Sequence, residues 1–454
     1  MSTHKSASRS GSTIDMLGEG ALTSKIIRFA LPLMASGVVQ QSFNSVDVAV
    51  VGKFVGAGAL AAVGANMPVV SLIINLFVGI SVGANVVIAN YIGQRDGAGV
   101  RRAVATSMML ALLSGVLLLA VGLFVARPVL TALGTPDEVM ADAALYLRLL
   151  ALGFPALMVY NFASAVLRSV GDTRRPFYWL VIGGLINVVL NLVMVLCFGL
   201  GVEGVAIATA VSNMVSAAGV VAILLRERSD LHLDVHALRL HRGELGKILR
   251  IGVPTGIQGM VFALSNSFIQ SGINAFGRDA MAGSAAALNF EMYCYYVISS
   301  FAQAAVAFIS QNYGAGQISR CRQIFARCMA LSVVACFALN VIIFVWRYDF
   351  ISLFTGQPEA MHFAALRVEN VLISQFLACS YEVSGASMRA IGYPMTPTIL
   401  IIFGTCLLRV GWVLTGVAHD FATLMAIYPI TWVVTGTAVV TAWVVVSRKV
   451  LKLA

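Results

Sequence analysis

The sequence predicts an all-α polytopic membrane protein with twelve transmembrane helices in two six-helix lobes. The chain of 454 residues is 59% hydrophobic and only 11% charged, with a mean hydropathy of +0.89. A soluble domain of this length needs a far larger share of polar surface. Apolar runs of about 20 residues, each long enough to cross the hydrocarbon core as a helix, recur along the whole chain. An internal repeat divides these runs into two sets.

The apolar runs define twelve spans. The first six lie near Lys25–Val51, Ala59–Ala89, Ala103–Val125, Leu145–Ser164, Phe177–Leu200 and Val202–Leu225. The second six lie near Ile248–Ile273, Ser284–Gln311, Phe325–Trp346, Phe363–Met388, Thr396–Val417 and Phe421–Val446. The chain then divides into a cytosolic tail at 1–24, an N-lobe at 25–225, a cytosolic linker at 226–247, a C-lobe at 248–446 and a cytosolic tail at 447–454.

The basic residues indicate the orientation of these spans. Most of the 30 Lys and Arg residues fall in the tails and in alternate loops, which by the positive-inside rule face the cytosol. Both termini are therefore expected in the cytosol. The net charge of +10 then reflects topology and contact with anionic lipids, and no nucleic-acid partner is expected.

Cysteine and histidine residues give no strong indication of a site. The seven cysteines lie mostly within apolar runs, which favours packing over a disulfide framework. His232, His236 and His241 could suggest a metal site in the linker, but no Cys or paired carboxylate completes a ligand shell there, so a solvated linker is the favoured interpretation.

The two halves of the chain repeat each other. The segment Ile26–Pro32 parallels Ile248–Pro254 at an offset of 222, and Leu167–Gly171 parallels Met388–Gly392 at an offset of 221. Six helices return the chain to its starting side, so the halves share one orientation and are related by a pseudo-two-fold axis along the membrane normal.

One acid has no counterpart in the repeat. From Phe29 to Val46 the chain has no charged residue, and Asp47 follows. A charge in such a segment costs several kcal/mol unless a polar cavity or a partner receives it, so its default interpretation is functional. The position 222 residues later is Ile269, which cannot ionise. The first half therefore carries an ionisable group that the second half lacks at the equivalent position.

Three polar residues are candidates to contact the Asp47 carboxylate. Asn187 and Asn191 are four residues apart and share one face of the fifth span, and Thr209 lies in the sixth. At 1.5 Å per residue, Asp47, Asn191 and Thr209 lie roughly 10–12 Å from the outer surface. A carboxylate at that depth can accept a proton or complete the oxygen shell of a sodium ion. The alternatives are that the two Asn residues only bond across helices and that Thr209 bonds its own helix.

The second half carries other ionisable residues within its spans. Glu291 lies in the eighth span just before Tyr293, Glu382 lies in the tenth, and Arg409 in the eleventh could neutralise either acid. They could form a structural ion pair. They could instead line a pocket in which an acid attracts a cationic substrate beside aromatic rings.

Several motifs in order give the chain a family resemblance. They are Val51-Gly52 followed by Ala59–Gly64, then Leu167–Thr173, Gly201–Thr209 and Gln311–Gly316. On a frame of six plus six helices, the chain resembles the MATE (multidrug and toxic compound extrusion) transporters, in their bacterial DinF-like/MepA-like branch. The resemblance implies a V-shaped, two-lobed bundle. It also implies export of organic, often cationic, compounds by alternating access, against an inward flow of protons or sodium ions.

The resemblance also implies roles for individual residues. The family's N-lobe cation site has an Asp in the first helix, an Asn and an Asp four apart in the fifth, and a Thr in the sixth. Asp47, Asn187 and Thr209 match this pattern, whereas Asn191 replaces the second acid, which favours proton over sodium coupling. Pro32 would be the hinge of the first helix, and Glu291 resembles the acid that one branch carries in its eighth helix.

Other functions remain as alternatives. A lipid-linked oligosaccharide flippase of the same superfamily would share the architecture, but the sequence lacks a row of buried basic residues. An enzyme is not expected, because no dyad or phosphate loop lies within a span. We expect no cofactor beyond the transported proton or sodium ion, small organic substrates and membrane lipids as partners, and a monomer.

Overall fold

The structure is a computed structural model that describes residues 13–18, 20–132, 135–416 and 419–450. All regular elements within these residues are helices. Ten of the described helices are long and apolar enough to cross a membrane, and one further bent pair passes the same test together. The predicted fold class, an all-α polytopic membrane protein, is confirmed.

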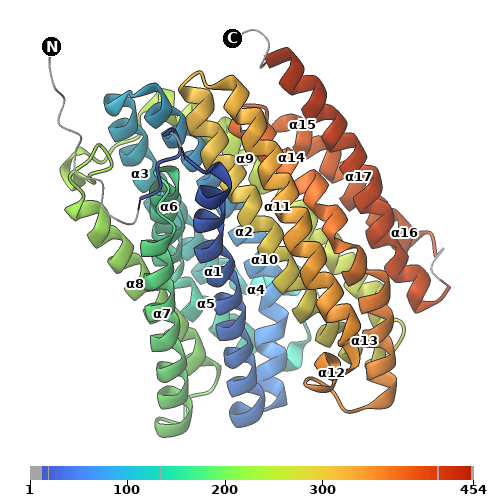
Figure 1. Cartoon of the computed structure of the whole chain (residues 1–454). Helices are drawn as coiled ribbons and strands as arrows, with labels where there is room; N and C mark the ends of the chain where they lie inside the picture. Colours follow the sequence, from blue (N-terminus) through green and yellow to red (C-terminus); the bar gives the residue numbers. More distant parts are fainter. Residues whose placement is uncertain (1–12, 19, 133–134, 417–418, 451–454) are drawn as a thin grey trace, which may run out of the picture. The chain divides into compact units, whose positions relative to one another are not determined.

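The first half of the chain runs through eight α-helices and two π-helical segments (Figure 1). They are α1 (Leu22–Val50), η1 (Val51–Val55), α2 (Ala57–Gln94), α3 (Gly97–Phe124), α4 (Ala126–Ala132), α5 (Asp137–Ala151), α6 (Phe154–Ser169), α7 (Arg174–Leu192), η2 (Val193–Cys197) and α8 (Val202–Arg226).

The second half follows a linker that contains the 3₁₀ turn η3 (Val235–Ala237). Its elements are α9 (Arg242–Asn274), α10 (Arg278–Gly314), α11 (Ile318–Val345), α12 (Arg347–Ser352), α13 (Pro358–Asn370), η4 (Leu372–Leu377), α14 (Ala378–Ala390), α15 (Met395–Ile401), η5 (Ile402–Leu407), α16 (Leu408–Leu414) and α17 (Phe421–Val450). Of these, η4 is a 3₁₀ helix and η5 is a π-helix.

Two of the predicted spans are not single straight helices. The fourth is the pair α5 and α6, which bend by 47° where Pro155 enters at the start of α6. Proline has no N–H and suits the first turn of a helix, so a new helix begins there. The tenth span consists of α13, η4 and α14, because the tighter turn of η4 interrupts it. Val417, at the end of the eleventh predicted span, lies outside the described residues.

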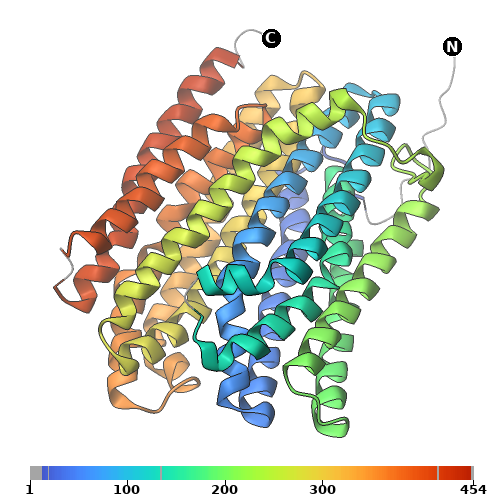
Figure 2. The same cartoon turned by 180° about the vertical axis from the view of Figure 1, so that it is seen from behind.

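By packing, the described residues form two compact units, each dominated by one half of the chain. The first contains residues 13–18 and 35–256, and the second contains residues 20–34 and 257–450. The division cuts α1 and α9 at equivalent positions, shortly after Pro32 and Pro254. Each repeat thus contributes the beginning of its first helix to the unit made by the other repeat. α9 nevertheless runs through Pro254 without a break, and Figure 2 shows it in yellow-green as one long helix.

The beginning of α9 packs closely against α2 within the first unit. Gly79 and Gly83 on α2 face Gly252 and Gly256 on α9, each pair being four residues apart and so on one helix face. A Cβ atom on Gly252 would lie 2.5 Å from the Cα atom of Ile80. Small residues let helices approach closely in a membrane, where lipid supplies no hydrophobic drive for association.

Polar contacts hold the same segment of α9 near the end of α2. The Lys247 Nζ atom donates to the Tyr91 hydroxyl at 2.7 Å, and Arg102 Nε donates to Glu244 Oε1 at 2.9 Å. These contacts tie the first turns of α9 to α2 and α3.

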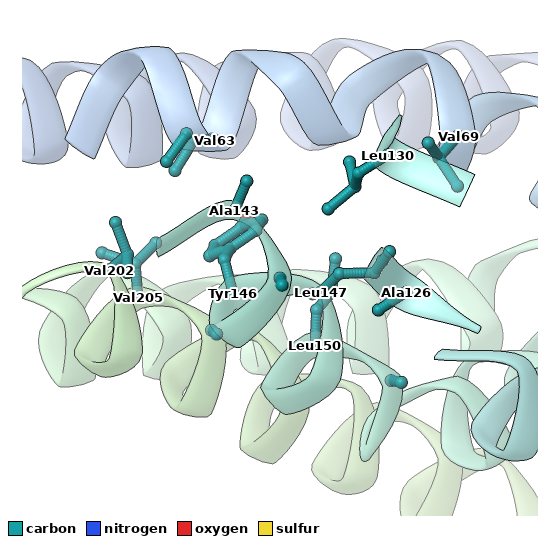
Figure 3. Close-up of a cluster of buried hydrophobic side chains, with 14 of the residues drawn as sticks. Val63, Val69, Ala126, Leu130, Ala143, Tyr146, Leu147, Leu150, Val202 and Val205 are labelled. Carbon is teal, nitrogen blue, oxygen red and sulfur yellow. The ribbon is translucent and has the colours of Figure 1, made fainter. Parts of the chain in front are cut away.

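The apolar core of the first unit includes a cluster of side chains from α2, α4, α5 and α8. Val63, Leu130, Tyr146 and Val205 all belong to it and converge between these helices (Figure 3). Val50 and Val51, close after Asp47, are part of the same cluster. The end of α1 therefore packs among buried apolar side chains a few residues after Asp47.

The glycine contact generates a stability prediction. Gly252→Ala should destabilise the protein by about 1–3 kcal/mol, because the new methyl group would overlap the α2 backbone and force the helices apart. The measurement is the thermal unfolding midpoint in nanodiscs. Gly246→Ala, in the same helix, is the matched control, because its Cβ would meet no atom within 4 Å. The control should be neutral or stabilising, since Ala favours a helix over Gly. Equal midpoints for the two variants would contradict this prediction.

Candidate functional site

Asp47 lies at one end of a continuous chain of side-chain hydrogen bonds in the first unit. The Nδ2 group of Asn191 donates to the Asp47 carboxylate and lies 3.3 Å from Asn187 Oδ1. Asn187 Nδ2 donates to Thr209 Oγ1 at 3.3 Å, and Thr209 in turn donates to the Val205 carbonyl oxygen at 2.9 Å. The structure thus brings together the four polar residues that the sequence singles out, from α1, α7 and α8.

The side chains that are linked to Asp47 by hydrogen bonds are all uncharged. Asn187 and Asn191 are buried, whereas Asp47 is only half-buried. Within the described part of the chain, the Lys and Arg side chains that form ion pairs do so with other acids. The Asn191 amide stabilises the carboxylate by hydrogen bonding, but it does not neutralise the charge. Asp47 can therefore still gain a proton or a cation.

Two π-helical segments lie beside this chain of hydrogen bonds. η1 begins at Val51, four residues after Asp47, and η2 begins at Val193, two residues after Asn191. A π-turn widens the helix and leaves backbone groups out of the regular pattern, and such turns are frequent at functional sites. The Oδ1 atom of Asn191 is buried with no hydrogen-bond partner, so the site holds an unused acceptor next to the acid.

Glu291 in the second unit is neutralised by a residue that the sequence analysis missed. Arg367 on α13 donates from Nε to Glu291 Oε1 at 2.6 Å and from Nη2 to Oε2 at 3.0 Å. Arg367 Nη1 also donates to the Ser284 hydroxyl at 2.9 Å, and Gln375 Nε2 donates to the Glu291 carbonyl oxygen. A two-point contact of this kind is the strongest form of ion pair. The sequence does place a basic residue, Arg367, near the start of the tenth predicted span, and this residue could have been considered as a partner for Glu291.

Arg409 does not pair with Glu291, which corrects the sequence-based expectation. Its Nη1 donates to Asn266 Oδ1 at 3.1 Å and its Nε donates to Thr431 Oγ1 at 3.4 Å. The guanidinium carbon lies 4.3 Å from the ring centre of Tyr428 and 5.4 Å from that of Phe262. Two aromatic faces therefore hold this cation in place of an acid.

The remaining candidates in the second unit lie outside the Glu291–Arg367 contact. Glu382 is on α14, and Arg389, in the same helix, donates to Gln258 Oε1 at 3.0 Å. Tyr293 is half-buried, and its spacing of two residues turns it away from the face of Glu291. Among the described residues, no group of three or more His, Cys, Asp or Glu side chains could hold a metal ion, and all seven cysteines are free.

Pro32, the expected hinge, lies inside an unbroken helix. α1 runs from Leu22 to Val50 through this residue, and the boundary between the two units falls just after it. Before the boundary, Phe29 packs edge-on against Phe308 of the second unit, with ring centres 5.5 Å apart. The position of Pro32 is compatible with bending of the helix between its two differently packed parts.

Long apolar helices, one of which contains a carboxylate that accepts a hydrogen bond from a neutral amide, define a polytopic membrane protein with a buried polar site. The MatE family model matches residues 32–193 and 254–413, and so covers both halves of the repeat. The chain therefore belongs to the MatE family.

Several known proteins are similar to the chain over most of its length. The probable multidrug resistance protein YoeA of Bacillus subtilis is 29% identical over 382 residues, covering 83% of this chain and 82% of the relative. The probable multidrug resistance protein NorM of Thermotoga maritima is 26% identical, with coverage of 83% and 82%. A multidrug resistance MATE family transporter of the MOP superfamily, solved in an outward-facing conformation, superposes with a TM-score of 0.88 at 24% identity, covering 98% of this chain and 99% of that one. This last likeness shows the fold.

The buried ion pair generates a second stability prediction. Glu291→Gln should lower the stability by about 3–5 kcal/mol, because it leaves the Arg367 cation buried without its counterion. The thermal unfolding midpoint in nanodiscs is the measurement, and Glu359→Gln, at an exposed acid in the first turn of α13, is the matched control. The double variant Glu291→Leu/Arg367→Met should recover part of the loss, since it removes both charges together. A double variant no more stable than Glu291→Gln would argue against the pairing as the cause.

Proposed function

We propose that the protein exports small organic compounds across the membrane in exchange for a coupling cation, and that Asp47 takes up this cation. The observation that carries the proposal is the chain from Asp47 through Asn191 and Asn187 to Thr209, in which one carboxylate is held by neutral groups. Membership of the MatE family and the names of YoeA and NorM support small organic substrates. Asn187, Asn191 and Thr209 would then hold Asp47 in both of its charge states.

A proton is the coupling ion that the site favours. Asp47 is the one acid of the chain of hydrogen bonds, and the amide nitrogen of Asn191 faces it. A sodium ion bound at Asp47, Asn187, Asn191 and Thr209 would require the amide of Asn191 to rotate, so that its buried, unpartnered oxygen faced the ion. Proton uptake needs no such rotation.

Alternating access would link this charge change to transport. In this proposal α1 bends at Pro32 as Asp47 changes its charge, and the site opens to one side of the membrane at a time. We place the protein in the bacterial cytoplasmic membrane with both termini in the cytosol, as the distribution of basic residues predicts, and as a monomer. A lipid-linked oligosaccharide flippase is not favoured, because the family model and the similar proteins named above belong to multidrug transporters.

Transport in proteoliposomes tests the proposed role of Asp47. Export of the cationic dye rhodamine 123 should follow an imposed proton gradient in the wild-type protein. Asp47→Asn should reduce it to the rate of protein-free vesicles, because the amide cannot take up a proton. The exposed acid Glu359 gives the matched control, since Glu359→Gln removes one carboxylate elsewhere and should leave transport unchanged. Wild-type transport by Asp47→Asn would refute the proposal.

Imposing proton and sodium gradients separately tests the coupling ion. The wild-type protein should respond to the proton gradient. Asn191→Asp supplies the second carboxylate of the family pattern and one further oxygen ligand, so it should increase the response to a sodium gradient. A wild-type protein driven by sodium alone would overturn the preference for protons.

A further inference from the structure

Arg409 is a buried cation for which the described residues supply no acid. Its side chain is only 1% exposed, and it is the largest of the fully buried side chains. Its Nη2 atom is buried without a hydrogen-bond partner. An ionisable group inside a transmembrane segment is expensive, so its default interpretation is functional. Of the two acids that the sequence offers to it, Glu291 is already neutralised by Arg367, and the hydrogen bonds of Arg409 go to Asn266 and Thr431 rather than to Glu382.

The contacts of Arg409 reproduce those of Asn187 in the other repeat. Asn187 bonds Thr209, and Arg409 bonds Thr431; positions 187 and 409 are 222 apart, and so are 209 and 431. Each bond spans 22 residues of chain. Thr209 donates to the carbonyl oxygen four residues before it at 2.9 Å, and Thr431 does the same at 2.8 Å. The two arrangements are therefore equivalent in the repeat.

The charges of these two equivalent sites are opposite. In the first unit the acid Asp47 is linked to the neutral Asn187 through Asn191. In the second unit Ile269 occupies the position of the acid, and Arg409 occupies the position of Asn187. A π-helical segment accompanies each site, since η5 ends at Leu407, two residues before Arg409. The first site presents a negative group and its copy presents a positive one.

Asn266 gives the buried guanidinium a connection to the surface. It is exposed on α9 while its Oδ1 atom accepts from Arg409 Nη1 at 3.1 Å. This neutral oxygen occupies a position that a carboxylate oxygen could take with a stronger, charge-assisted bond. Rotation of the exposed Asn266 side chain would free Nη1, and Nη2 is already without a partner. Two donors of one guanidinium are the requirement for two-point recognition of a carboxylate.

We propose that the second unit holds an anion-binding site centred on Arg409, which receives the carboxylate of an organic substrate. The carboxylate replaces Asn266 on Nη1 and supplies the missing acceptor for Nη2. Phe262 and Tyr428, whose ring centres lie 5.4 and 4.3 Å from the guanidinium carbon, add aromatic contacts to the site. This inference rests on the proposed export function and extends its substrates from cations to compounds that carry a carboxylate.

A matched pair of dyes tests the site. Rhodamine 110 carries a free carboxylate, and rhodamine 123 is its methyl ester, so the two differ only in the group that Arg409 would bind. The full-length protein in proteoliposomes should export both dyes under a proton gradient. Arg409→Gln should slow export of rhodamine 110 by at least about tenfold, because it removes a charge-assisted contact, and should leave export of rhodamine 123 close to the wild-type rate. Arg278→Gln, at an exposed arginine in the first turn of α10, is the matched control.

A second variant keeps the test independent of folding. Asn266→Asp places a carboxylate against Arg409 from an exposed position, so it should block rhodamine 110 selectively even if Arg409→Gln does not fold. Equal effects of either variant on both dyes, or no effect on either dye, would overturn the anion site. Wild-type export of rhodamine 123 without export of rhodamine 110 would also overturn it while leaving the proposed function intact. Export of neither dye under any gradient would instead count against the proposed function.

Discussion

The cost of holding a charge away from water governs the polar chemistry of this protein. Each ionisable group inside the helices is stabilised by a different kind of contact. Glu291 and Arg367 neutralise each other through two bonds and tie α10 to α13. Asp47 accepts a hydrogen bond from the uncharged amide of Asn191, so its charge is stabilised without being neutralised. Arg409 lies between aromatic rings and neutral oxygens. The first arrangement is suited to structure, whereas the other two leave a charge that can respond to an ion or a ligand.

Backbone packing determines where these charges can lie. Close approach of α2 and α9 through Gly79, Gly83, Gly252 and Gly256 leaves no room for side chains at that contact. Just beyond Asp47, Val50 and Val51 join the apolar cluster that contains Tyr146 and Val205. Three π-helical segments lie beside Asp47, Asn191 and Arg409, within the part of the chain that the structure describes.

Much of this arrangement could be predicted from the sequence, because depth in a membrane follows directly from residue number. The sequence predicts that Asp47, Asn191 and Thr209 lie at one depth, and in the structure hydrogen bonds join these three residues through Asn187. The partner of Glu291 could not be predicted in this way. Whether Arg367 or Arg409 faces it depends on the rotation of each helix about its own axis, which hydropathy does not specify. The bend at Pro155 was also missed, because a run of apolar residues has the same length whether or not the helix is straight.

The first part of α1 and the first part of α9 each belong to the unit that the other repeat mostly forms, and this exchange bears on the origin of the fold. Residues 20–34 complete the second unit and residues 242–256 complete the first, so neither repeat contains every segment of the unit that it mostly forms. A single copy of the repeat would lack part of its own core and could complete it only with a second copy. Joining two copies of a chain that forms a domain-swapped homodimer would produce the same arrangement. Separating the two halves at the linker would then recreate two mutually dependent subunits rather than two independent domains.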